Sequence, residues 1–109
     1  MEQKDLNQYF IKSQNPDVCQ KLYNDAICYI NGKGYEMKEH QKEALLNHIS
    51  EMVKRNINKE QMEVQDKTVF NEVSQDSLEK AKEIVNQLEY VSDDETYLLS
   101  IHFEVVKYN

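Results

Sequence analysis

The chain has 109 residues, a length that suits one domain, and a formal net charge of −7 from 13 Lys plus Arg against 20 Asp plus Glu. This acidic balance argues against direct binding to nucleic acid, which requires a basic surface. No apolar run approaches the roughly 20 residues of a membrane-spanning helix, and the first residues lack the pattern of a secretory signal. We therefore expect a cytoplasmic protein that binds neither nucleic acid nor membrane directly.

The N-terminal half predicts two helices. Gly and Pro are scarce, with two and one residues respectively, which favours helices over many short strands. Asn15 is typical of a helix cap before Pro16, and apolar residues at every fourth position predict a helix over about residues 16–30. After the glycines at 32 and 34, a second apolar stripe predicts a helix from about residue 37 to 55 or 56.

Residues 1–14 are expected to form an N-terminal extension, in which Leu6, Tyr9 and Phe10 make a short helix or an ordered tail. Residues 15–109 are expected to form a single helical domain. Two cysteines within the first predicted helix, Cys19 and Cys28, would lie on opposite faces, too far apart for a disulfide.

The C-terminal half predicts two further long helices. After a polar loop over residues 56–67, a short helix could be anchored by Val69, Phe70 and Val73. Asp76 with Glu79 is a cap signature that predicts a helix over about residues 77–89.

The sequence Ser92-Asp93-Asp94-Glu95 has the pattern of a capping box and predicts a last helix that reaches about residue 107. A strand is the competing interpretation, because the apolar residues Leu99, Ile101, Phe103 and Val105 alternate with polar ones.

Two histidines, His48 and His102, interrupt apolar stripes of different predicted helices. Arg55 follows His48 by seven residues and Glu95 precedes His102 by seven, so each charge lies two turns from its histidine on the same face. If the helices pack antiparallel with the histidines opposed, Arg55 faces Glu95, and this ion pair lies about ten ångströms from the paired imidazoles. Alternatively, both histidines are structural core residues.

These two segments resemble a known family. Residues 45–55, LLNHISEMVKR, resemble the first histidine motif of the phosphotransferase-system regulation domain (PRD), in which Asp-His-Ile leads to an Arg seven positions on. Residues 95–103, ETYLLSIHF, resemble its second motif of an acidic residue, an apolar run and a His. Asn47 and Tyr97 stand where the family usually has Asp and often has Gly. The resemblance spans about residues 15–107.

The resemblance implies an all-α bundle of five helices, the first paired with the fourth and the second antiparallel to the fifth. It also implies that His48 and His102 accept phosphoryl groups from the phosphocarrier HPr or a sugar-specific transporter subunit, with Asn47, Arg55 and Glu95 as supporting residues. Family antiterminators and activators carry a nucleic-acid-binding domain ahead of the regulation domains, where this chain has about fourteen residues.

We therefore expect a stand-alone bacterial regulatory module that is not an enzyme and has no cofactor. It would sense phosphotransferase-system status through histidine phosphorylation and act in transcriptional regulation by contact with an unknown output partner. The tyrosines are spread along the chain, so some aromatic surface should remain exposed on a single domain. We expect a second copy of the chain to cover it in a homodimer. The main alternative is a helical dimerisation or interaction module with structural histidines. A metal-dependent enzyme using His48, His102 and Glu95 is the third interpretation.

Overall fold

The computed structural model describes residues 6–64, 68 and 72–109, and within them the chain is all-helical, with no strand. The elements are α1 (Asn7–Lys12), α2 (Pro16–Gly32), α3 (Glu39–Asn58), α4 (Gln75–Val85), α5 (Asp94–Val105) and a short 3₁₀ turn, η2 (Val106–Tyr108). The all-α prediction is confirmed, and the strand interpretation of the last segment is wrong. Val69 and Phe70, expected to anchor a short helix, lie outside the described residues.

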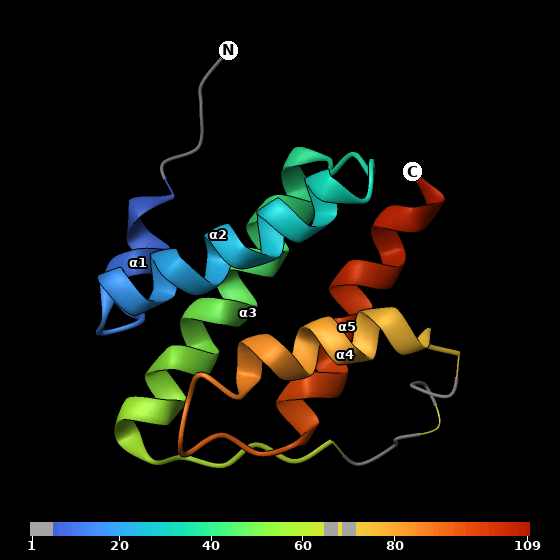
Figure 1. Cartoon of the computed structure of the whole chain (residues 1–109). Helices are drawn as coiled ribbons and strands as arrows, with labels where there is room; N and C mark the ends of the chain where they lie inside the picture. Colours follow the sequence, from blue (N-terminus) through green and yellow to red (C-terminus); the bar gives the residue numbers. More distant parts are fainter. Residues whose placement is uncertain (1–5, 65–67, 69–71) are drawn as a thin grey trace.

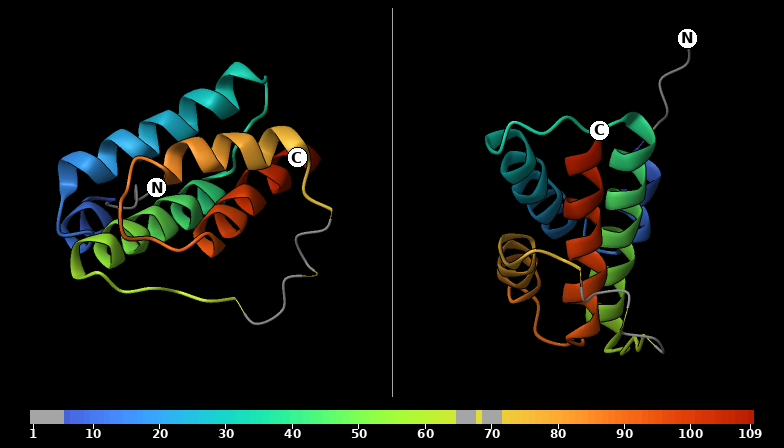
Figure 2. Two further views of the ribbon diagram at one scale, coloured as in Figure 1. Left: turned by 60° about the horizontal axis from the view of Figure 1, so that its bottom comes forward. Right: turned by 90° about the vertical axis from the view of Figure 1, so that its right-hand side faces the viewer.

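The long helices form two crossed pairs (Figure 1). Helices α3 and α5 lie side by side and run in opposite directions, and α2 and α4 form a second antiparallel pair that crosses them on one side (Figure 2). The family resemblance counts its helices from the one at residue 16, so its first, second, fourth and fifth helices are α2, α3, α4 and α5. The pairing that it implies, first with fourth and second antiparallel to fifth, is therefore confirmed. None of the helices in the described part of the chain is long and apolar enough to span a membrane.

The core lies between these two helix pairs. Every long helix contributes a buried apolar stripe, as its spacing of three and four residues dictates. The fully or almost fully buried apolar residues are Cys19, Leu22, Ala26, Ile30, Leu45, Leu46, Ile49, Met52, Val53, Ala81, Ile84, Val85, Leu88, Leu99, Phe103 and Val106. Cys19 is buried and Cys28 is exposed, in keeping with their predicted opposite faces.

The N-terminal extension packs onto this bundle through α1, which contacts α3 and α2. Leu6, Tyr9 and Phe10 are partly buried against the core, as a short ordered helix requires. Helix α2 begins where the sequence predicts, since the side chain of Asn15 accepts a hydrogen bond from the backbone N–H of Val18 at 3.3 Å.

Helix α4 ends at Val85, four residues before the predicted end at residue 89. The side chain of Asn56, near the end of α3, accepts hydrogen bonds from the backbone N–H groups of Glu89 and Tyr90 at 3.0 and 2.8 Å. The helical ladder has already ended before them, because the N–H groups of Gln87 and Leu88 bond the carbonyls three residues back. A contact with α3 therefore holds the segment that follows α4, and no local residue pattern encodes it.

The two predicted cap signatures of the C-terminal half are wrong in detail. Helix α4 begins at Gln75, and Asp76 accepts a hydrogen bond from the hydroxyl of Tyr29 at 2.9 Å instead of capping the helix. Before α5, the N-cap is Asp93 without a side-chain cap bond, and the hydroxyl of Ser92 donates to the carbonyl of Met62. Glu95 is directed toward α3, where it forms the site described next.

Candidate functional site

His48 on α3 and His102 on α5 lie face to face. Their ring centroids are 5.4 Å apart and their planes are inclined by 28°, which is a stacked arrangement. The antiparallel packing of α3 and α5 brings together two residues that are 54 positions apart. The predicted pairing of the two imidazoles is confirmed, whereas the third histidine, His40, is exposed at the start of α3.

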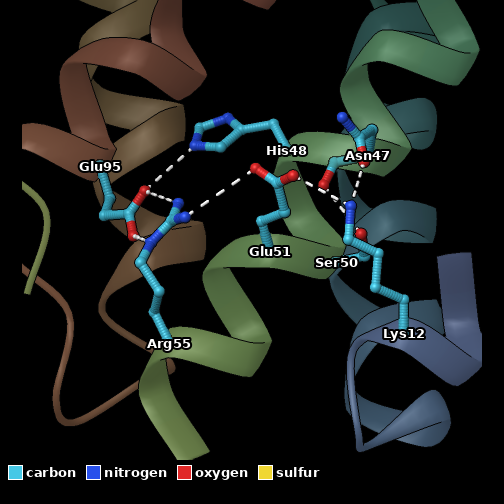
Figure 3. A network of polar contacts seen from close by, with 7 residues as sticks. All are labelled: Lys12, Asn47, His48, Ser50, Glu51, Arg55 and Glu95. Carbon is cyan, nitrogen blue, oxygen red and sulfur yellow. Dashed lines mark hydrogen bonds and ion pairs between the residues drawn. The ribbon is translucent and has the colours of Figure 1, made fainter. Parts of the chain in front are cut away.

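The carboxylate of Glu95 lies at the centre of the site and is fully buried (Figure 3). Its Oε2 accepts a hydrogen bond from Nε of Arg55 at 2.7 Å, and its Oε1 accepts one from Nη2 at 2.8 Å. Oε1 also contacts Nε2 of His48 at 3.1 Å. Such a bidentate, charge-assisted pair is among the stronger polar contacts in proteins.

The predicted ion pair between Arg55 and Glu95 is therefore confirmed, but its predicted distance of about ten ångströms from the imidazoles is wrong. The prediction used only the rise along the helix axis between the two residues and did not include the length of their side chains. The side chains of His48 and Arg55 start two turns apart on α3 and converge on one carboxylate (Figure 3). Glu95, the acidic residue of the second motif, thus binds His48, the histidine of the first motif.

The local electrostatics keep this pair ionised. Burial opposes the charge on Glu95, but the hydrogen bonds from His48 and Arg55 outweigh it and hold the pKa of Glu95 below its ordinary value. The hydrogen bonds between Arg55 and Glu95 raise the pKa of Arg55. The pKa of His102 is lowered to about 4, chiefly by burial and further by His48, so His102 is neutral at pH 7.

The contact with Glu95 also fixes the state of His48. A carboxylate only accepts hydrogen bonds, so Nε2 of His48 carries the proton, and in the neutral ring Nδ1 holds the lone pair. Among the described residues, Nδ1 of His48 is the one buried side-chain nitrogen or oxygen without a hydrogen-bond partner. The His48 ring is thus held through Nε2, and its buried Nδ1 makes no hydrogen bond.

Asn47, the residue before the first histidine, is directed toward α1. Its side-chain oxygen accepts a hydrogen bond from Nζ of Lys12 at 2.8 Å, and the same ammonium donates to Glu51 at 2.9 Å (Figure 3). Sequence reasoning missed both Lys12 and Glu51. Glu51 precedes Arg55 by four residues, a spacing that places them together on a helix and could have revealed it. Lys12 has no such signal, since its contact depends on how α1 packs.

Among the described residues, no group of three or more His, Cys, Asp or Glu side chains is arranged to hold a metal ion.

Comparison with known proteins identifies the family. The family model described as the PRD domain matches residues 20–106, which include both histidines, Arg55 and Glu95. The chain belongs to the PRD domain family. Its PRD domain is also similar to a crystal structure of a PRD-containing transcription regulator from Lactobacillus casei ATCC 334, with a TM-score of 0.78 and 29% sequence identity. That match covers 99% of this chain and 97% of the other. No curated protein matches the chain.

Proposed function

We propose that this PRD domain is a cytoplasmic regulatory module of the sugar phosphotransferase system that accepts phosphoryl groups on histidine and signals by protein contact, in transcriptional regulation. The observation that carries the proposal is the stacked pair of His48 and His102 beside the buried Arg55–Glu95 pair. Membership of the PRD family supports the same function. The expected donors are the phosphocarrier HPr or a sugar-specific transporter subunit.

In the proposed transfer, a lone pair on the acceptor imidazole attacks the phosphorus of a donor phosphohistidine. A new N–P bond forms while the donor's N–P bond breaks, and the proton that the acceptor ring loses balances the proton that the donor ring gains. The product places a dianionic group on a packed helix face, and Arg55 is the cation of the site that can approach it. The resulting repulsion of Glu95 would reorganise the contact between α3 and α5 and so transmit the signal.

The two histidines differ in readiness for this reaction. His102 is neutral at pH 7, and in the described structure its ring has no hydrogen bond that would have to break first. His48 is bound to Glu95 through Nε2, and its Nδ1 is buried, so either nitrogen of His48 becomes available only when the site opens. These differences favour His102 as the first acceptor and His48 as an acceptor in a rearranged state.

Phosphoryl transfer from phosphoenolpyruvate through the general enzymes tests the proposal. We expect the wild type to be labelled and the double variant to show background label only. His102→Gln should lose most of the label, whereas His48→Gln should retain part of it. Substitution of the exposed His40 by Gln serves as the control and should leave labelling unchanged. Wild-type protein that stays unlabelled, or a double variant labelled as well as wild type, would reject phosphoryl acceptance at these residues.

The second candidate function is an interaction module whose histidines are structural. The buried His48–Glu95 contact favours it, because the hydrogen bond joins α3 and α5 as a structural histidine would. In that case no label is transferred at all, yet both histidine variants lose stability. The labelling experiment therefore separates the two functions.

We also propose that the chain forms a two-fold dimer. Two of its tyrosines, Tyr90 and Tyr108, are exposed, and Ile11, Ile57 and Val105 are further exposed apolar residues. Tyr108 and Val105 lie three residues apart at the C-terminal end, where Tyr108 is 85% exposed. Light scattering at micromolar concentration should give a mass of about two chains. A monomer under these conditions would contradict the proposal.

A further inference from the structure

A second polar network connects α1 to the histidine site. Besides the apolar packing of Tyr9 and Phe10, helix α1 makes polar contacts with one face of α3, and the α3 residues of these contacts form a stripe that recurs at every fourth position. The hydroxyl of Tyr9 donates to Glu43, and Lys12 contacts Asn47 and Glu51. The next position of this stripe is Arg55, which belongs to the site. The stripe therefore leads from the N-terminal extension to Glu95.

Glu51 is shared between two cations. Its Oε1 accepts a hydrogen bond from Nζ of Lys12 at 2.9 Å, while its Oε2 lies 3.9 Å from Nη1 of Arg55. Arg55 in turn is held more closely by Glu95, at 2.7 and 2.8 Å. Glu51 and Glu95 are thus competitors for Arg55, and Lys12 supplies the other charge that Glu51 binds.

We propose that Lys12 is a positioning residue for the histidine site: by binding Glu51, it leaves Arg55 with Glu95. When α1 leaves α3, Glu51 loses its nearer cation and draws Arg55 away from Glu95. The docking of α1 thereby controls the charge balance around His48. By thermodynamic reciprocity, a group that recruits Arg55 at His48 also changes the affinity of α1 for α3. The importance of this coupling for signalling depends on the proposed function, whereas the coupling itself does not.

Nuclear magnetic resonance of the Arg55 Nε–H group tests the coupling in the unphosphorylated full chain. Lys12→Met should speed hydrogen exchange of this group about two- to fivefold, the range expected for a partly exposed ion pair. Lys12→Arg should restore the wild-type rate. Lys42→Met is the matched control, because Lys42 is as exposed as Lys12, at 39% against 38%, and also pairs with a glutamate. It should leave Arg55 unchanged.

The decisive variant is Glu51→Gln. If Glu51 acts as a competitor, adding Glu51→Gln to Lys12→Met returns the Arg55 exchange rate to that of wild type. An unchanged rate in Lys12→Met overturns the proposal. So does a rate that stays fast in the double variant, because this would mean that α1 stabilises the site by packing alone. The experiment involves no phosphoryl group, so failed labelling of the wild type bears on the proposed function and leaves this coupling separately testable.

Discussion

Replacement of Arg55 by Met is expected to lower the free energy of unfolding by about 3 kcal/mol. The reason is the position of Glu95: its side chain is 1% exposed, and Arg55 supplies two of its three hydrogen bonds. Without the guanidinium, the buried carboxylate keeps only the contact with His48. For a domain of this size, such a loss lowers the melting temperature by more than about 10 °C, which thermal and urea denaturation can measure.

Lys80→Met is the matched control for this prediction. The side chain of Lys80 is 20% exposed, close to the 18% of Arg55, but its partner Glu83 is 70% exposed. Removal of this cation should cost less than about 1 kcal/mol, because water solvates the remaining carboxylate. Addition of Glu95→Gln to Arg55→Met should recover part of the stability, since it removes the buried charge. Equal losses in Lys80→Met and Arg55→Met would contradict this account of the buried pair.

The sequence predicts the helices well because their determinants are local. The apolar spacing of α2 and α3 and the Asn15 cap depend only on residues within one or two turns, and the structure reproduces them. The seven-residue offsets of Arg55 and Glu95 also predict the pairing across α3 and α5. Each offset places the charged residue on the same helix face as its histidine and two turns away along the axis. When the two histidines oppose each other on antiparallel helices, Arg55 and Glu95 therefore lie opposite each other as well.

The residues that sequence analysis assigned wrongly are those whose partners are distant in the chain. Glu95 fits a capping box locally, but its carboxylate accepts hydrogen bonds from Arg55 and His48 on α3, and the charge-assisted pair with Arg55 is stronger than a bond to a backbone N–H. Asn56 on α3 holds the segment that follows α4, and Lys12 reaches the site only because α1 packs on α3. In each case a polar side chain forms a contact with a residue distant in the chain, and the pattern of neighbouring residues does not encode that contact.

The pH dependence of stability is expected to reflect His102. The pKa of His102 is about 4 in the folded chain, against about 6.5 in an unfolded one. Between these two values the unfolded chain binds a proton that the folded chain does not, so the free energy of unfolding falls as the pH falls from about 6.5 to 4. The shift corresponds to a loss of about 2 to 3 kcal/mol over this window. Above pH 7 the ring is neutral in both states and contributes no slope.

The variant His102→Gln separates this contribution from the others. Glutamine does not titrate, so the variant should lose about 2 to 3 kcal/mol less than wild type when urea denaturation is repeated from pH 7 to pH 4. Glu95 acts in the same direction at lower pH, because its pKa lies below its ordinary value and protonation breaks its pairing with Arg55. That loss begins only near and below pH 4.5 and remains in the variant. If His102→Gln and wild type keep parallel curves between pH 6.5 and 5, then His102 does not stay neutral in the folded chain, and the argument for it as the first phosphoryl acceptor loses its basis.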